Sequence, residues 1–298
     1  MTDIKHPICD YEGSDYQTSF WEQGGRQYED AAEVIALQRL LPTQGDLLLE
    51  LGAGAGRNTP RYVGFKQVVL LDYSLTQLEQ AKIKLGRNQH YIYVAADIYN
   101  LPFVDGLFDA ATMIRTLHHM ADPQAALHQV RRTLQPRAVF ILEYANKHNL
   151  KAILRYKLKR QAWSPFTLES VEFEKLNFDF HPEMVRTWLK EAGFTIEKQL
   201  AVSYFRLGLL KKLLPLTLLT SLEKRIQLTG DRYQFSPSIF TRNRAAGTTA
   251  KAVEGKFFRC PACSIDELMP HGARIICTGC NRSWPIRDGI FDFRMDQP

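Results

Sequence analysis

The order of apolar and polar residues predicts an α/β architecture. After a first helix at residues 30–41, short apolar runs alternate with segments of helical periodicity up to about residue 202. Short buried strands that alternate with helices are typical of a mostly parallel sheet covered by helices on both faces. The expected strands are residues 46–51, 67–72, 91–96, 108–114, 138–143, 194–202 and 233–242, and the expected helices between them are residues 74–85, 123–134 and 182–192.

Two later segments interrupt the alternation, and we expect them to form caps over the sheet at about residues 147–163 and 205–225. The first holds six Lys or Arg and no acid, interleaved with apolar residues, which predicts a basic amphipathic helix. The second is apolar but is broken by two lysines and Pro215, which predicts a pair of buried or interfacial helices. The apolar part of the second segment, residues 207–222, has sixteen residues, fewer than the roughly 20 that a membrane-spanning helix needs.

Composition and charge narrow the class of protein. The 298 residues are 45% hydrophobic, enough for one large and one small domain, and 18 Gly, 14 Pro and 23% charged residues exclude collagen-like, disordered and coiled-coil chains. The net charge is −4 over residues 1–145, +9 over residues 146–250 and +1 over residues 251–298. The positive middle third favours an anionic partner, or is a solvated face. The polar first residues lack the apolar core of a signal peptide, so we expect a cytoplasmic protein, with peripheral membrane contact as the alternative.

A glycine-rich turn follows the first strand of the predicted sheet. Gly52, Gly54 and Gly56 form a loop in which the third glycine comes one residue earlier than in the dinucleotide-binding pattern. Glu50 stands two residues before the first glycine, and its carboxylate would repel a pyrophosphate and suit a ligand with a positive group. Glycines let the backbone approach a ligand closely because they carry no Cβ. The loop therefore predicts a site for a cationic small molecule.

The next two strands also end in acids. Asp72 closes the second strand, where an acid can accept hydrogen bonds from both hydroxyls of a ribose. Asp97 follows the third strand and offers an acceptor for an adenine amino group, and Ile98 offers an apolar floor for the ring. Together with the glycine loop, these residues predict a site for a nucleoside that carries a positive charge.

These motifs resemble those of class I S-adenosylmethionine-dependent methyltransferases of the type 11-like group, over about residues 45–145. The motifs that match in order are Glu50–Gly56, Asp72, Ala96–Ile98, Leu101–Phe103, Phe108–Asp109, Leu117–His119 and Leu134–Pro136. The resemblance implies a Rossmann-like, seven-stranded α/β sheet that binds S-adenosyl-L-methionine at its carboxyl edge and leaves S-adenosyl-L-homocysteine. The implied cofactor-binding residues are Glu50, Gly52, Ala53, Gly54, Gly56, Asp72, Tyr73, Asp97 and Ile98, with Arg26 at the N-terminal helix as a candidate for the cofactor carboxylate.

The candidate catalytic residues lie near the ends of the fourth and fifth strands. Methyl transfer from a sulfonium needs mainly alignment of donor and acceptor, and a general base only where the acceptor loses its proton early. His118, His119 and Glu143 are the candidates, with His119 as the base. A histidine pair at this point is often structural in the family that the motifs resemble, so both interpretations stay open. Asn146 is a further candidate for orienting the acceptor.

Four of the five cysteines form two close pairs. Cys260 and Cys263 precede Cys277 and Cys280 by 13 residues, a spacing at which two turns can place four thiolates around one zinc ion. The region resembles the small zinc ribbons typified by the activator subunit of tRNA and protein methyltransferases. We therefore expect a methyltransferase domain at residues 1–245, a linker at 246–256 and a zinc ribbon with structural zinc at 257–298. The fifth cysteine, Cys9, is expected to be an inert thiol.

The sequence leaves three functions open. The favoured acceptor of the methyl group is a small-molecule or lipid-like substrate with anionic character, which the basic middle third would meet. The second alternative is an RNA base, in rRNA or tRNA, with the ribbon contacting the substrate or a partner. The third is a non-catalytic scaffold that binds the cofactor.

Overall fold

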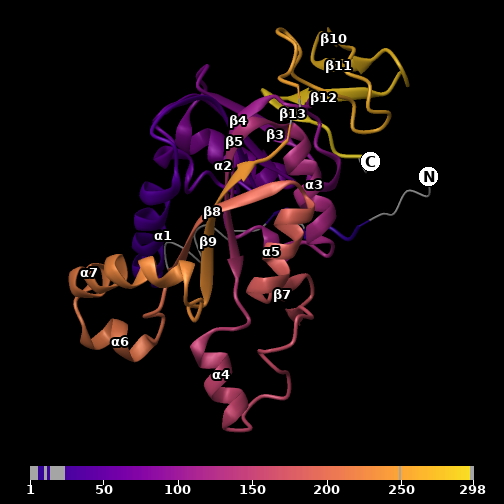
Figure 1. Cartoon of the computed structure of the whole chain (residues 1–298). Coiled ribbons are helices and arrows are strands. Elements are labelled where there is room, and N and C mark those ends of the chain that lie inside the picture. The colour runs from indigo at the N-terminus through magenta and orange to yellow at the C-terminus, as the bar shows by residue number, and fades with distance from the viewer. Residues whose placement is uncertain (1–5, 10–11, 14–23, 248–249, 296–298) are drawn as a thin grey trace.

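The computed structural model describes residues 6–9, 12–13, 24–247 and 250–295. Five parallel strands form the centre of one large sheet (Figure 1): β1 (Gly45–Leu51), β2 (Phe65–Asp72), β3 (Tyr91–Ala95), β4 (Phe108–Met113) and β5 (Leu134–Ala145). Their order across the sheet is β3-β2-β1-β4-β5, and β9 (Ser238–Ala245) and β8 (Phe194–Val202) continue it with antiparallel pairing. The predicted α/β sheet is confirmed.

Helices cover both faces of this sheet. They are α1 (Gln27–Leu40), α2 (Leu75–Leu85), α3 (Pro123–Thr133) and α5 (Pro182–Glu191). Helix α2 begins where the Ser74 hydroxyl accepts a hydrogen bond from the Gln77 N–H, and it ends at Gly86 with a φ of 85°. Adjacent β1 residues Leu48 and Leu49 point to opposite faces and are both fully buried, because each face packs against helices.

The carboxyl ends of the central strands meet at one edge. Leu51 of β1 lies in register with Leu71 of β2 and Met113 of β4, and Asp72 lies in register with Ala95 of β3. The short helices η2 (Thr59–Arg61), η3 (Ile98–Asn100) and η4 (Leu117–His119) start close to this edge. The loops after β1, β2, β3 and β4 are therefore brought together, as ligand sites in open α/β sheets require.

Seven strands of the sheet come from residues 45–245, and four strands of the cysteine-bearing region bring the total among the described residues to eleven. Strands β10 (Leu268–His271), β11 (Arg274–Cys277), β12 (Ser283–Arg287) and β13 (Ile290–Asp292) extend it at the β3 edge. β13 pairs in parallel with β3, because backbone N–H and C=O groups at that edge need partners. The last predicted strand, residues 233–242, is β9 at Ser238–Ala245, so it begins five residues later and ends three residues later than expected.

Side chains join the cysteine-bearing region to the rest of the protein. The Phe258 ring lies 6.0 Å from that of Phe103 and 4.9 Å from that of Phe293. Lys82 of α2 forms an ion pair with Asp288 at 2.5 Å, between Nζ and Oδ2. The region expected as a separate domain therefore packs directly against the first one.

The two cap segments depart from the expectation in length. The predicted helix at 147–163 is only α4 (Leu150–Lys157), and the chain turns at Lys159, whose φ is 54°. A hairpin of β6 (Val171–Glu174) and β7 (Asn177–Asp179) follows. The helix pair is confirmed as α6 (Gly208–Leu213) and α7 (Leu216–Ile226), which are followed by η5 (Gln227–Asp231). Within the described ranges, every helix is too short or too polar to cross a membrane.

Candidate active site and metal centre

A cavity opens at the carboxyl edge of the sheet, and the three acids of the predicted site line it. Glu50 comes from β1, Asp72 from the end of β2, and Asp97 from the turn after β3. Ala53, Gly52, Gly54, Tyr73 and Ile98 line the same cavity, whereas Gly56 does not. The structure therefore brings together residues that are 48 positions apart in the sequence, as the strand order predicts.

Glu50 is buried at the base of the cavity. Its Oε2 accepts a hydrogen bond of 2.6 Å from the Thr59 hydroxyl. Burial raises the pKa of Glu50 to about 7, against the opposing effects of Thr59, Tyr62 and the guanidinium groups of Arg57 and Arg61. A carboxylate that is buried away from water is costly when it is ionised and unpaired. A cationic ligand would therefore stabilise the ionised form of Glu50 by pairing with it.

The glycine loop has no room for side chains on one side. Gly52 has a φ of 67°, and a Cβ built on it would lie 2.1 Å from the Thr116 hydroxyl oxygen. Gly54 has a φ of 53°, and its N–H donates a hydrogen bond of 2.8 Å to Asp72 Oδ2. Gly56 supports the loop from behind, where a Cβ would meet Leu85 of α2 at 2.8 Å. The loop and the second acid are thus held as one unit.

Asp72 and Asp97 each fix a turn as well as facing the cavity. Asp72 Oδ1 accepts a hydrogen bond of 3.0 Å from the Ser74 N–H at the start of α2. Asp97 caps η3 by accepting from the Tyr99 N–H at 2.9 Å. Ile98 is 8% exposed and belongs to the main hydrophobic cluster, which gives the cavity an apolar wall. These contacts orient both carboxylates without taking them out of the cavity.

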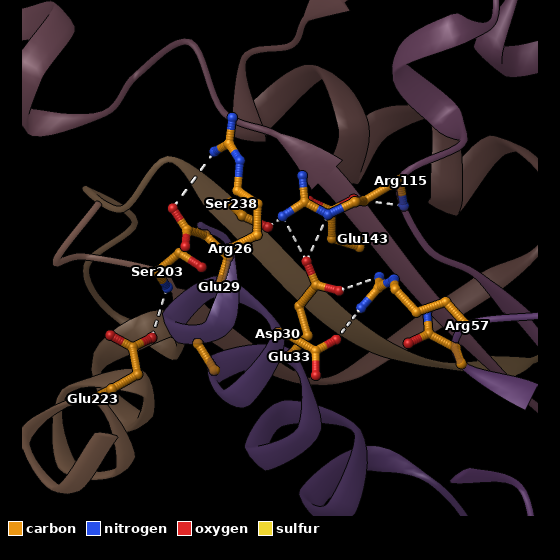
Figure 2. A network of polar contacts seen from close by, with 12 residues as sticks. Arg26, Glu29, Asp30, Glu33, Arg57, Arg115, Glu143, Ser203, Glu223 and Ser238 are labelled. Carbon is orange, nitrogen blue, oxygen red and sulfur yellow. Dashed lines mark hydrogen bonds and ion pairs between the residues drawn. The ribbon is translucent and has the colours of Figure 1, made fainter. Parts of the chain in front are cut away.

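Arg26, the predicted partner of the cofactor carboxylate, lies outside the cavity lining. It precedes α1, and its Nη1 lies 3.5 Å from Glu29. The guanidinium groups that do line the cavity belong to Arg57 and Arg115. Glu33 lies between them (Figure 2), 2.6 Å from Arg57 Nη2 and 2.6 Å from Arg115 Nη2.

The buried Glu33 carboxylate fixes these two arginines. Burial alone would raise its pKa, but the guanidinium groups of Arg115 and Arg57 lower it to about 2. Glu33 is therefore ionised at neutral pH, and it holds both cations at the wall of the cavity. The sequence offered no sign of this arrangement, because the three residues come from α1 and from the loops after β1 and β4.

The two histidines occupy different environments. His119 lines the cavity, and its Nδ1 lies 2.9 Å from the Leu176 carbonyl oxygen. In the neutral tautomer that donates from Nδ1, the Nε2 atom carries the lone pair. Burial lowers the pKa of His119, so the neutral ring dominates at pH 7. His118 is buried outside the cavity lining, with its ring 4.0 Å from that of His119.

Glu143 is not a cavity residue, which corrects the prediction of a catalytic role. Its Oε2 accepts a hydrogen bond of 2.8 Å from the Arg115 N–H, and its Oε1 accepts one from the Ser238 hydroxyl. It supports the Arg115 loop, whose φ of 55° needs such a contact. Asn146 likewise uses its side-chain amide to donate to the main chain at Gln234 and Ser236.

Arg206 is a residue that the sequence analysis missed. It lies between β8 and α6, and its Nε is buried with no hydrogen-bond partner among the residues that the structure describes. Burial lowers the pKa of His118 most, followed by the neighbouring His119 ring and then by the guanidinium groups of Arg115 and Arg206. Both guanidinium groups therefore lie near His118. The Nδ1 of His118 is also buried and finds no partner in the described ranges. Neither residue lines the cavity, and each keeps one polar atom buried without a hydrogen-bond partner in the described ranges.

Cys9 also lines the cavity, together with Pro7 and Ile8. From the sequence alone, Cys9 was expected to be an inert thiol. An isolated cysteine near the N-terminus carries no periodic signal, so only the three-dimensional structure could place it here.

The four paired cysteines come together in the C-terminal region. Their Sγ atoms all lie within 4.8 Å of one another, with Cys260 and Cys280 at 3.7 Å and Cys263 and Cys277 at 3.4 Å. Four thiolates around zinc, at about 2.3 Å from the metal, would be about 3.8 Å apart. The two turns match: Ser264 N–H donates to the Cys260 carbonyl at 2.8 Å, and Asn281 N–H donates to that of Cys277 at 2.9 Å. The residues present fit a tetrahedral metal.

Comparisons with known proteins agree with this geometry. Residues 49–142 match a family model described as "Methyltransferase domain". The chain is 33% identical over 143 residues to the O-methyltransferase cnsE of Penicillium expansum, which covers 43% of the chain and 50% of that protein. It is 28% identical over 172 residues to a demethylmenaquinone methyltransferase of Clavibacter sepedonicus, covering 54% of the chain and 70% of that protein. The chain thus spans about half the length of the first of these relatives.

Solved structures show the same fold at low identity. The chain resembles an S-adenosylmethionine dependent methyltransferase from Mesorhizobium loti, with a TM-score of 0.51 and 17% identity, over 73% of this chain and 99% of that one. It also resembles a chain in the Haloferax volcanii complex between a methyltransferase activator and a methyltransferase, with a TM-score of 0.55 and 15% identity, over 78% of this chain and 96% of that one. Residues 49–142 therefore match a methyltransferase domain, and the chain has the Rossmann-like α/β fold of these solved structures.

Proposed function

We propose that the chain transfers a methyl group from S-adenosylmethionine to a small-molecule or lipid-like acceptor with anionic character. The observation that carries the proposal is the cavity in which Glu50, Asp72 and Asp97 stand on three neighbouring strands around a glycine loop. When bound, the cofactor supplies a methyl group on a positive sulfur, which becomes a neutral thioether as the acceptor takes the methyl.

Each acid has a role that its position supports. Glu50 binds the cationic methionine end of the cofactor at the base of the cavity. Asp72 accepts hydrogen bonds from the ribose hydroxyls, and Asp97 accepts one from the adenine amino group, while Ile98 packs against the ring. Arg57 or Arg115, held by Glu33, pairs with the cofactor carboxylate in place of Arg26.

His119 is our candidate for a general base, because it is the predicted catalytic residue that lines the cavity. Its hydrogen bond to Leu176 fixes the ring and leaves Nε2 to accept the proton of the acceptor. Substitution His119→Asn should lower kcat and leave the Kd for the cofactor unchanged. If His119→Asn lowered kcat and weakened cofactor binding by the same factor, His119 would not act as the general base.

Arg206 is our candidate for binding a negative group of the acceptor. Burial lowers the pKa of Arg206, the carboxylates of Glu143, Glu33 and Glu29 oppose this, and its Nε keeps a donor without a partner among the described residues. The relatives agree in chemical class, since their names include a demethylmenaquinone methyltransferase and a 2-phytyl-1,4-naphtoquinone methyltransferase. A phenolate or hydroquinone oxygen fits this environment. Arg206→Gln should reduce kcat/KM by about 10-fold to 100-fold, the usual contribution of a hydrogen bond to a charged group, with cofactor binding intact.

Two measurements test the proposed function. Calorimetry should show 1:1 binding of S-adenosylmethionine, weakened strongly by Asp72→Ala, and no heat at millimolar cofactor would refute the assignment. Transfer of a labelled methyl group should then be compared between a prenylated 1,4-naphthohydroquinone and total RNA. Label that enters only RNA would establish the alternative acceptor, and label that enters neither with cofactor bound would favour the scaffold.

We also propose that the four cysteines hold one structural zinc ion. The Sγ distances and the matching turns support this site, and all four positions of a tetrahedron are taken by thiolates. Purified protein should contain one zinc per chain. Cys280→Ser should lose the metal, whereas the matched control Cys9→Ser should retain it. A metal content near zero in folded protein would exclude the site.

A further inference from the structure

Two segments of the chain project from the same edge of the sheet. In register, Ala145 at the end of β5 pairs with Ser238 of β9, which also pairs with Val202 at the end of β8. The segment with α4 begins just after Ala145, and the segment with α6 and α7 begins just after Val202. In Figure 1 both lie beyond the sheet at the end opposite β10 and β11. This edge is also the one at which the cofactor cavity opens.

These segments expose an unusual amount of apolar surface. Twelve of the 21 exposed large hydrophobic side chains among the described residues belong to residues 150–168 and 207–228. Leu150, Leu154 and Leu158 are 61%, 56% and 53% exposed, and Leu213 is 68% exposed. Within α4, which the structure describes completely, Ala152 is the only buried residue. Single exposed hydrophobic residues need no explanation, but a concentration of them marks an interaction surface.

Positive charges accompany this apolar surface. Lys151, Arg155 and Lys157 lie on α4, Lys159 and Arg160 follow its end, and all five are exposed. Residues 147–168 contain no acid, and the single acid in residues 207–230 is the buried Glu223. Lys212, Lys224 and Arg225 are exposed on the second segment. Apolar side chains beside cations, without acids, are typical of a segment that lies in the headgroup region of an anionic membrane.

We propose that residues 150–168 and 207–228, which we call the docking surface, bind the surface of an anionic lipid bilayer. The apolar side chains enter the boundary between headgroups and acyl chains, and the cations pair with lipid phosphates. The cofactor cavity then faces the bilayer side of the molecule, from which an apolar acceptor would reach it. Membrane binding in itself does not depend on the proposed methyl transfer.

Vesicle co-sedimentation of the full chain tests the proposal. Vesicles of phosphatidylcholine alone are compared with vesicles that contain one quarter phosphatidylglycerol. We expect at least tenfold tighter binding to the anionic vesicles, and a loss of binding as salt is raised. The double variant Lys157→Glu/Arg160→Glu should weaken vesicle binding by about 25-fold or more, because each of the two cations that it removes contributes about fivefold. Leu154→Asp and Leu213→Asp should each weaken it by about tenfold or more.

Matched controls separate the docking surface from general charge and apolarity. Lys84→Glu/Lys251→Glu makes the same charge change at exposed positions elsewhere, and Ile83→Asp changes a side chain that is 83% exposed on α2. These variants should bind vesicles like the unaltered protein. Equal weakening in variants and controls, or no binding to anionic vesicles, would overturn the proposal. So would a dimer in ultracentrifugation that Leu154→Asp dissociates, because a second copy would then occupy the surface.

Cofactor calorimetry on the same proteins separates this proposal from the proposed function. A chain that binds anionic vesicles but no S-adenosylmethionine refutes the function and supports the docking surface. A chain that binds S-adenosylmethionine but no anionic vesicles refutes the docking surface and leaves the proposed function standing.

Discussion

Replacing Glu33 by Gln tests whether one buried carboxylate both stabilises the fold and fixes the cofactor site. The side chain keeps its size and loses its charge, and Arg57 and Arg115 are left without their shared partner. Breaking a buried ion pair from one side is costly because the remaining charge stays buried.

The size of the effect follows from the pKa of Glu33. The folded protein lowers it from an ordinary 4.5 to about 2, and each unit corresponds to about 1.4 kcal/mol, so the charge contributes about 3 kcal/mol at pH 7. Because the folded pKa is depressed, this stability is present above pH 4.5 and is lost as the pH falls toward 2. Between pH 7 and pH 4, the difference between the unaltered protein and Glu33→Gln should narrow by about 1 kcal/mol.

Urea unfolding at the two pH values measures the stability difference, and calorimetry measures the Kd for S-adenosylmethionine. We expect Glu33→Gln to weaken cofactor binding by about tenfold, because two guanidinium groups at the cavity wall lose the contact that orients them. Glu29→Gln is the matched control: Glu29 is also buried on α1, but it pairs with Lys211 and Arg26, which do not line the cavity. It should reduce stability and leave the Kd unchanged.

Two results would refute this reasoning. If Glu33→Gln and Glu29→Gln changed the Kd equally, the ion pairs of Glu33 would have no special connection with the cavity. If the stability difference were the same at pH 7 and pH 4, the Glu33 charge would not be its source.

Three further predictions concern the cavity lining. Gly52→Ala should abolish cofactor binding and cost about 2–3 kcal/mol in stability, since its Cβ would overlap Thr116 at a φ of 67°. The control Gly86→Ala has a φ of 85° and open space around the new Cβ, so it should cost less stability and keep cofactor binding. Urea unfolding measures the stability of both variants, and calorimetry measures their cofactor binding. Because burial raises the pKa of Glu50 to about 7, protonation should weaken cofactor binding as the pH falls from 8 to 6, by at most tenfold for each unit below 7. Glu50→Gln should remove this dependence in calorimetry, and a persisting slope would exclude Glu50 as its origin. Cys9 should react with iodoacetamide more slowly in saturating cofactor, and an unchanged rate would place the ligand elsewhere.

The sequence was most informative where function depends on local geometry. Glu50, Asp72 and Asp97 follow from the pattern because each stands at the end of a short apolar strand, and parallel strands bring such ends to one edge. The cysteine pairs also carry their geometry in their spacing. No knowledge of long-range packing is needed for either.

The sequence was less informative where distant segments decide which way a side chain points. Glu143 stands at the predicted strand end, but its direction depends on β9, where Ser238 comes 95 residues later. Arg26 has the right charge in the right region, yet the long side chains of Arg57 and Arg115 reach the cavity instead. Arg206 lies in a loop without periodic pattern, so its burial becomes visible only in the folded protein.

The pairing of β13 with β3 has a consequence for how the protein folds. The two partners, Ile290–Asp292 and Tyr91–Ala95, are separated by almost 200 residues, so the contact closes one of the longest loops in the chain. Until the late strand arrives, β3 is an open edge that can pair with a neighbouring chain. A nascent polypeptide that stalls before the cysteines should therefore be prone to aggregate.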